Sequence, residues 1–298
     1  MQPFSKNRDG FDQAGDYRGM VGCLASMHKK EEAIAQPFFR RLGIKLHTPC
    51  GLDTDQMGTF TGEIPRLGTM NDAALAKAQA GLQLSGHTLA IASEGSYGPH
   101  PALPFSYSGL ELMVFVDADK GIAITESILE PSPVYNAVTI GTDFAGLEDF
   151  VHGIDLPHHA LVTAPNDARA DITTMSKGIR NFDDLKKAIL RCCAQSVDRK
   201  AFVQTDMRAH MNQRRMETIA KLAKRLADRV ARSCPECGVA GFGFEKAVLG
   251  LPCSECGAPS TLVEKEIWAC AACPFRMHQH RPDGLRSADP QYCTLCNP

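Results

Sequence analysis

The sequence lacks an apolar run of the roughly 18 residues that a membrane-spanning helix needs. Its first residues, MQPFSKNRDGFDQAGDYRG, contain no apolar secretory core. Neither sign of charge dominates, because the formal net charge is -2 and the pI is about 6.5. Such a chain has no overall field that attracts nucleic acid or an anionic membrane, so a charged partner must be bound locally. We expect a cytoplasmic protein with no membrane partner.

The hydrophobic pattern before residue 199 predicts an α/β fold. Short apolar segments typical of buried strands alternate with amphipathic segments typical of helices. Asn71 is expected to cap one helix, and a hairpin is expected across 110–130 with its tight turn at 119–121. The hairpin makes the sheet mixed, and the alternation predicts helices on both of its faces. We expect strands at 20–26, 44–49, 87–93 and 159–165 and helices at 29–43, 72–86 and 182–196.

Composition divides the chain into four predicted parts. Residues 1–19 are polar and aperiodic and are expected to form a flexible leader. The α/β domain is expected at 20–198. A basic helical connector is expected at 199–232, where ten Lys and Arg face three Asp and Glu. The remaining residues, 233–298, form a predicted zinc-binding module.

The zinc prediction rests on cysteine spacing. Eight of the twelve cysteines form four Cys-x-x-Cys pairs in the last 65 residues, a pattern typical of metal ligation in a reducing compartment. Each pair directs two thiolates at one tetrahedral ion, and a site with four thiolates has no open position for water. We therefore predict two structural Zn²⁺ ions in a double zinc-ribbon-like module. The predicted ligands are Cys234, Cys237, Cys253, Cys256, Cys270, Cys273, Cys293 and Cys296.

The spacing leaves the pairing of the four knuckles open. The simplest arrangement is sequential, with the first two knuckles on one ion and the last two on the other. A cross-braced arrangement joins the first knuckle with the third. Residues 233–298 carry five Lys and Arg against seven Asp and Glu, and a zinc ion with four thiolates adds about -2 more, which disfavours phosphate binding there.

The connector is the candidate surface for an anion. The segment QTDMRAHMNQRR, 204–215, concentrates polar donors beside a helix start, and helix N-termini and arginine forks both bind phosphate. We predict that Arg208, His210 and Arg214 face an anionic ligand, and nucleic acid is a candidate partner for 199–232. The competing interpretation is an Asp206–Arg208 network that only fixes the junction.

A second candidate site lies where predicted strands end. The segment LAIASEGSYGPHPALPF, 89–105, begins as a buried strand and continues into a loop rich in Gly and Pro that carries Glu94. Open α/β sheets bind ligands in the crevice beyond strand carboxyl ends. The first strand likewise ends at Ser26, followed by Lys30 at a helix start, a combination suited to phosphate. His28 and His100 are candidates for a general base, since histidine titrates near neutrality.

The order of these elements resembles the inosine triphosphate pyrophosphatase-like family. The matching positions are Ser26 with His28 and Lys30, then Glu63, then NDAALAKA at 71–78, which contains Lys77, and ASEGS at 92–96. His28 stands where that family has Asn, and one acid, Glu94, stands where it often has two. The resemblance implies Mg²⁺ and a nucleotide substrate.

The chain as a whole more closely resembles a bacterial family catalogued as domain of unknown function DUF6671. The shared segments are TGEIPR, ASEGSYGPHPALPF, TDMRAHMN and the cysteine pairs. That resemblance brings no assigned reaction.

Two functions follow as hypotheses, and oligomeric state is left open. In the first, the protein is a Mg²⁺-dependent phosphohydrolase for a nucleotide-like phosphorylated ligand, with Glu63 and Glu94 on the metal and Lys30 and Arg66 neutralising the phosphates. In the second, it is a noncatalytic, zinc-containing binding or regulatory protein that recognises an anionic ligand or nucleic acid. The residues expected to bind substrate are Ser26, Arg66, Lys77, His100, Arg208, His210 and Arg214.

Overall fold

The computed structural model describes residues 17–27, 29–52, 68–100, 103–131, 133–169, 171 and 173–298. The described chain forms two compact units, Arg18–Leu226 and Ala227–Pro298, the latter including Tyr17. Across the described ranges, no helix combines the length and the apolar character needed to cross a membrane.

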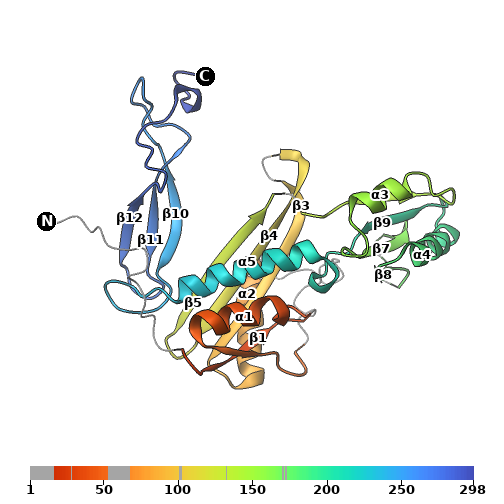
Figure 1. Ribbon diagram of the computed structural model, residues 1–298, viewed down its shortest axis with the longest axis horizontal. Helices are drawn as coiled ribbons and strands as arrows, with labels where there is room; N and C mark the ends of the chain where they lie inside the picture. The colour runs from red at the N-terminus through yellow and green to blue at the C-terminus, as the bar shows by residue number, and fades with distance from the viewer. Residues whose placement is uncertain are drawn as a thin grey trace. The chain divides into compact units, whose positions relative to one another are not determined.

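The larger unit contains a mixed five-stranded sheet with the order β2-β1-β3-β4-β5 (Figure 1). β1 is parallel to both neighbours, whereas β4 is antiparallel to β3 and β5. The predicted mixed sheet and its hairpin turn are therefore confirmed. The strands are β1 (Val21–Ala25), β2 (Lys45–His47), β3 (Leu89–His100), β4 (Leu103–Asp117) and β5 (Ile122–Glu130).

Helix α2 (Met70–Ser85) packs on one face of this sheet through small side chains. Ala74 and Ala78 form a buried cluster with Ala90, Ala92 and neighbouring strand residues. Successive strand residues point to opposite faces, so the side chains between these alanines point away from α2. Small residues on both elements permit a close approach of helix and sheet.

The opposite face of the sheet contacts α1 (Glu31–Leu42) and α5 (Gln213–Val230) (Figure 1). The ring of Phe38 in α1 stacks on that of Phe115 in β4, with centroids 6.2 Å apart. Ile219, Ala223 and Leu226 of α5 are fully buried, as their helical spacing predicts.

The start of α2 differs from the prediction. Thr69, not Asn71, is the N-cap, and it forms a capping box with Asp72: the Asp72 N–H donates to Thr69 Oγ1, and the Thr69 N–H donates to the Asp72 carboxylate. The Asn71 side chain instead accepts a hydrogen bond from Thr125 on β5.

The prediction that a loop carries Glu94 is wrong. β3 runs through Glu94 to His100, and its antiparallel register with β4 continues to the pair His100↔Leu103. Cross-strand hydrogen bonds to β4 hold this Gly-rich stretch extended, and proline is tolerated at its far end. Glu94 therefore lies inside a strand, opposite Leu112.

A second, antiparallel sheet with the order β6-β9-β7-β8 lies in the same unit. Its core joins strand residues such as Ile140 and Val203 to Leu185 and Ile189 of α4. The sequence interpretation missed β6, β8 and β9, and β9 falls where a helical connector was expected. The elements are β6 (Ala137–Ile140), α3 (Leu147–Gly153), β7 (Leu161–Pro165), β8 (Ser176–Ile179), α4 (Phe182–Gln195) and β9 (Ala201–Thr205).

The smaller unit is built on an antiparallel sheet with the order β10-β11-β12. Its strands are β10 (Gly243–Leu249), β11 (Val263–Ala269) and β12 (Arg276–His280). Phe242 lies close to the rings of Trp268 and Phe275, with centroids 6.1 and 5.8 Å away. One cysteine knuckle precedes β10, one follows each of β10 and β11, and one follows β12.

Candidate functional site

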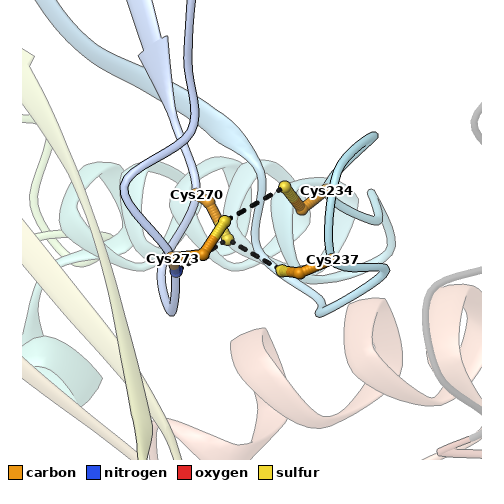
Figure 2. Close-up of side chains that lie close together, drawn as sticks. All are labelled: Cys234, Cys237, Cys270 and Cys273. Atoms are coloured by element: carbon orange, nitrogen blue, oxygen red, sulfur yellow. Dashed lines mark hydrogen bonds between the residues drawn. The ribbon is translucent and has the colours of Figure 1, made fainter.

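Two cysteine tetrads stand at the ends of the three-stranded sheet. In each tetrad the four sulfur atoms lie within 4.8 Å of one another. Figure 2 shows the tetrad formed by the first and third knuckles. The two tetrads are Cys234, Cys237, Cys270 and Cys273, and Cys253, Cys256, Cys293 and Cys296.

The sulfur spacing suits a metal ion better than disulfides. Sulfur–sulfur distances across the first tetrad are 3.8 Å (Cys234–Cys273) and 3.6 Å (Cys237–Cys270). In the second tetrad the sulfur–sulfur distances are 3.9 Å (Cys253–Cys296) and 3.6 Å (Cys256–Cys293). Tetrahedral zinc with Zn–S bonds of about 2.3 Å has sulfur–sulfur edges of about 3.8 Å, whereas a disulfide bond is about 2.05 Å long. Each tetrad is therefore suited to hold one metal ion, and its ligand set is compatible with zinc.

The simpler, sequential pairing of the knuckles is wrong, and the cross-braced pairing is the observed one. The strand order explains why. β10 and β11 are antiparallel, so the start of β10 and the end of β11 lie at one end of the sheet, where the first and third knuckles meet. The second knuckle, between β10 and β11, lies at the other end and meets the fourth.

Main-chain donors favour the thiolate at two of these cysteines. Burial raises the pKa of Cys270, but N–H groups of Ala272 and Cys273, 3.3 and 3.4 Å from its sulfur, outweigh burial and lower that pKa to about 7. N–H groups of Cys296 and Leu295 lower the pKa of Cys293 to about 7. At Cys270 and Cys293 the knuckle turns therefore favour the thiolate, the form that binds metal, whereas the pKa values of Cys273 and Cys296 are raised to about 12.

A second candidate site lies just beyond the end of β1. The register Ala25↔Ala92 places Ser93 and Glu94 of β3 immediately past the last residue of β1. Lys30, the residue before α1, reaches this point, and its Nζ lies 3.0 Å from Ser93 Oγ. Together these residues lie at the carboxyl end of β1, beside the middle of β3, and open α/β sheets place ligands beyond strand carboxyl ends.

Glu94 and Lys77 complete this group from the α2 side of the sheet. The Glu94 carboxylate forms an ion pair with the Lys77 ammonium, and the two side chains are 9% and 10% exposed. We call Lys30, Lys77, Ser93 and Glu94 the β1-end cluster. Three members of this cluster, Lys30, Lys77 and Glu94, were predicted site residues. A fourth predicted residue, Ser26, is buried just past the end of β1.

Lys30 is unusual because its ammonium is buried. Desolvation is the largest cause of a pKa lowered to about 8, and the positive charge of Arg215 adds to it, while Glu111 and Glu94 oppose the shift. Lys30 is 8% exposed. At neutral pH it remains a cation whose charge is poorly hydrated.

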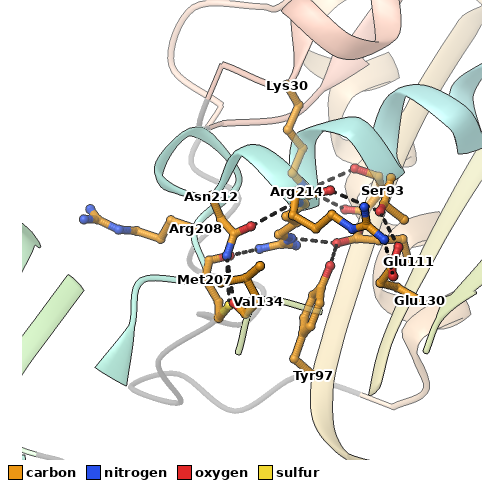
Figure 3. Close-up of polar contacts among 12 residues, drawn as sticks. Lys30, Ser93, Tyr97, Glu111, Glu130, Val134, Met207, Arg208, Asn212 and Arg214 are labelled. Atoms are coloured by element: carbon orange, nitrogen blue, oxygen red, sulfur yellow. Dashed lines mark hydrogen bonds and ion pairs between the residues drawn. The ribbon is translucent and has the colours of Figure 1, made fainter. Parts of the chain in front are cut away.

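Next to this cluster lies a buried ion pair that the sequence interpretation did not assign to a site. Arg215 of α5 donates from Nε to Glu111 Oε1 at 2.6 Å, and the Tyr97 hydroxyl donates to the same oxygen at 2.7 Å. Figure 3 shows Tyr97 pointing at Glu111, with Lys30 reaching toward Ser93. A signal was present in the sequence: Glu111 alternates with the apolar residues of a strand, a position that demands a buried partner.

The remaining predicted anion ligands are held by carboxylates or the main chain. Arg214 lies 3.1 Å from Glu130, which also accepts from Thr218. Arg208 donates to Asp206 from Nε and Nη2 at 3.0 and 2.6 Å, and Figure 3 shows its side chain extending away from Glu111 and Glu130. The Asp206–Arg208 network, named as the alternative, is therefore present.

Two predicted histidines lie outside the β1-end cluster. His100 Nδ1 accepts from the Leu103 N–H at 3.1 Å, where β3 and β4 pair for the last time. His210 belongs to the short 3₁₀ turn Ala209–Met211, and its carbonyl accepts from Arg180 at 2.9 Å. Their predicted contact with a ligand stays a prediction.

Three predicted catalytic or binding residues, His28, Glu63 and Arg66, lie outside the described residues. The predicted meeting of Glu63 with Glu94 is therefore still a prediction. Within the described ranges, the two cysteine tetrads are the only groups of three or more Cys, His, Asp or Glu side chains placed to share a metal ion.

Fold and sites together define a mixed α/β protein with two cysteine tetrads suited to metal. Comparison with family models matches residues 77–298 to the family described as domain of unknown function (DUF6671), and the chain belongs to that family. A search of curated proteins finds no match.

Proposed function

We propose that the β1-end cluster binds the phosphates of a nucleotide-like ligand and that the protein hydrolyses a phosphoanhydride bond there. The observation that carries the proposal is the convergence of Lys30, Ser93, Glu94 and Lys77 just past the end of β1. The cluster lies beyond the carboxyl end of β1, and open α/β sheets usually bind ligands beyond strand carboxyl ends.

The charges of the cluster and its neighbours suit an anion. Lys30, Lys77 and Arg215 supply three cations against the two carboxylates Glu94 and Glu111. The net charge of +1 favours an anion, and phosphate oxygens would offer the buried Lys30 ammonium hydrogen-bond acceptors in place of water. Lys30 and the Ser93 hydroxyl would orient phosphate oxygens, which is how enzymes of phosphoryl transfer obtain much of their rate.

Magnesium fits this proposal through Glu94. Mg²⁺ is usually held by one or two carboxylates together with substrate phosphates and water, and Glu94 offers one such carboxylate whose Lys77 partner would shift to the phosphates. Glu63 is the proposed second ligand. When bound, the ion would neutralise charge on the phosphates, while Lys30 and Lys77 hold the anion in place.

The proposal is tested by turnover. Purine and pyrimidine nucleoside triphosphates are incubated with the zinc-loaded protein and Mg²⁺, and release of phosphate and pyrophosphate is followed. We expect turnover of at least one of them and a loss of 100-fold or more in Glu94→Gln. Glu126→Gln is the matched control, since Glu126 is a buried carboxylate of the same sheet that pairs with Arg225 outside the cluster.

Absence of turnover on every nucleotide, or equal loss in both variants, would contradict a hydrolase. Binding without turnover would instead support the second candidate, a noncatalytic binding or regulatory protein. The Lys77–Glu94 ion pair favours that candidate, because it occupies the proposed metal ligand.

We also propose that both tetrads hold structural Zn²⁺. Four thiolates saturate tetrahedral zinc and leave no position for substrate water. In that role each ion crosslinks two knuckles at one end of the β10–β12 sheet.

Nucleic acid binding by residues 199–232 can involve fewer cations than the ten Lys and Arg of this segment, because some of them pair with carboxylates. Arg215, one of its basic residues, is 5% exposed and pairs with Glu111, and Arg225 pairs with Glu126 at 2.7 Å. Besides the paired Arg225, Lys221 and Lys224 are exposed cations of α5. Replacing both with Gln should reduce salt-dependent oligonucleotide binding; binding that is absent or insensitive to salt would exclude it.

A further inference from the structure

A cavity of about 790 Å³ lies between β8 and α4, outside the β1-end cluster. Its size is within the range of small-molecule sites, about 300–1,000 Å³. Four cationic side chains line it, against one carboxylate, that of Asp184. The four cations are Lys177, Arg180, Lys187 and Arg191.

Two of these cations are not neutralised by an ion pair. Arg180 donates to the carbonyls of Pro157 and His210 at 3.3 and 2.9 Å, and carbonyls orient a guanidinium without cancelling its charge. In the part of the chain that the structure describes, neither Arg180 nor Arg191 has a carboxylate within ion-pair distance. Lys187 lies 3.6 Å from Asp184, and both side chains are mostly exposed.

The wall that carries Arg180 is fixed in position by the TDMRAHM segment. The Gly178 N–H donates to Asp206 at 3.1 Å, and the His210 carbonyl accepts from Arg180, just past the end of β8. Gly178 has a φ of 75°, and an added Cβ would lie 3.3 Å from Met211. The segment therefore has a structural role and also fixes the guanidinium of Arg180, a residue that lines the cavity.

The second wall is one face of α4. Asp184, Lys187 and Arg191 recur at helical spacing of three and four, so they project from one side of the helix. Lys186, the neighbour of Lys187 in sequence, is placed differently: its Nζ lies 4.4 Å from the centroid of the Phe182 ring.

We propose that this cavity binds the phosphate group of a small molecule, with Arg180, Lys187 and Arg191 as its ligands. Arginine forks match phosphate oxygens, and a preset guanidinium loses little freedom on binding. Ile179 and Leu190, which also line the cavity, would contact an apolar part of the molecule. This site does not rest on the proposed hydrolase function.

The test uses the full chain and inorganic phosphate as the probe. Two-dimensional ¹H–¹⁵N NMR spectra are recorded during titration with phosphate at constant ionic strength, and acetate is titrated in parallel. We expect saturable shifts at residues 177–191 with phosphate. Arg191→Gln and Lys187→Gln should each weaken binding about threefold to tenfold, while Lys186→Gln, which removes the same charge one residue away, should bind as wild type does.

Shifts that do not saturate, or equal shifts with acetate, would show an adventitious ion only and overturn the proposal. Equal weakening by Lys186→Gln would overturn it as well, since it would indicate a general charge effect. Both test residues are exposed on α4, so their substitution leaves the core of the sheet intact, which unchanged spectra elsewhere would verify.

Discussion

Arg215 and Glu111 form a buried ion pair in the larger unit: Nε lies 2.6 Å from Oε1, and the side chains are 5% and 0% exposed. The pair joins α5 to the middle of β4, 104 residues earlier in the chain. Arg215 also donates to the Met207 carbonyl. The same guanidinium therefore fixes the TDMRAHM segment, the helix that follows it and the sheet beneath.

Replacing Arg215 by Met should destabilise the protein strongly. The substitution leaves Glu111 buried without its cation, and loss of one partner of a buried pair costs about 3–5 kcal/mol. The free energy of unfolding, measured with urea, checks this. Lys187→Met, which removes an exposed cation paired at 3.6 Å, should change it by less than about 1 kcal/mol. Equal effects would mean that the buried pair does not stabilise the fold.

Gly95 should not tolerate a methyl group. A Cβ there would lie 2.9 Å from Glu111 Oε1 and would overlap the Arg215 guanidinium. Overpacking of this kind costs about 1–3 kcal/mol, so Gly95→Ala should lower the free energy of unfolding by that amount. Gly98→Ala is the matched control on the same strand, because a Cβ at Gly98 meets nothing within 4 Å. Equal stability of the two variants would contradict this packing.

The cross-braced pairing predicts metal content in double variants. Cys234→Ser with Cys270→Ser removes two ligands of one tetrad, so about one of two zinc ions should remain. The double variant Cys234→Ser with Cys253→Ser removes one ligand from each tetrad and should retain no zinc, or only weakly bound zinc. Sequential pairing predicts the reverse. Zinc per chain, measured by elemental analysis after dialysis against a weak chelator, decides between them, and zinc-free wild-type protein would refute the zinc assignment itself.

Lys30 should make stability depend on pH above 8. Its pKa is about 8 in the folded protein against a reference of 10.5, so between these values the unfolded chain binds more protons than the folded one. Stability contributed by this residue therefore rises with pH across that window. The difference in the free energy of unfolding between wild type and Lys30→Met should increase from pH 7.5 to 10. A constant difference would show that Lys30 is not desolvated.

Local sequence signals were sufficient for the helices and for the metal ligands. The stripe Ile219, Ala223, Leu226 predicted the buried face of α5, and Cys-x-x-Cys spacing identified both tetrads. Pairing of the knuckles could not follow from spacing, because it depends on which ends of β10 and β11 meet. β8 and β9 were missed because strands of four and five residues carry too little periodicity to be distinguished from turns.

Only part of the candidate site was predicted, because some of its contacts join residues that are far apart in sequence. Glu94 and Lys30 were identified from their places after apolar segments, and they do lie near one another. Lys77 was also named as a substrate-binding residue, whereas the partners Ser93 and Arg215 depend on contacts between residues far apart in sequence. The loop assignment of Glu94 failed because hydrogen bonds to β4, not local propensity, keep Gly95 and Gly98 extended.

The central claim is that the β1-end cluster binds phosphate. It is tested most directly by isothermal titration calorimetry with a nucleoside triphosphate analogue whose β–γ bridge is methylene, in the presence of Mg²⁺. We predict that wild type binds and that Lys30→Met loses tenfold or more in affinity, about 1.4 kcal/mol, while Lys120→Met, a change in the β4–β5 turn, binds as wild type does. Equal affinity of Lys30→Met and wild type, or no binding by either, would contradict the claim.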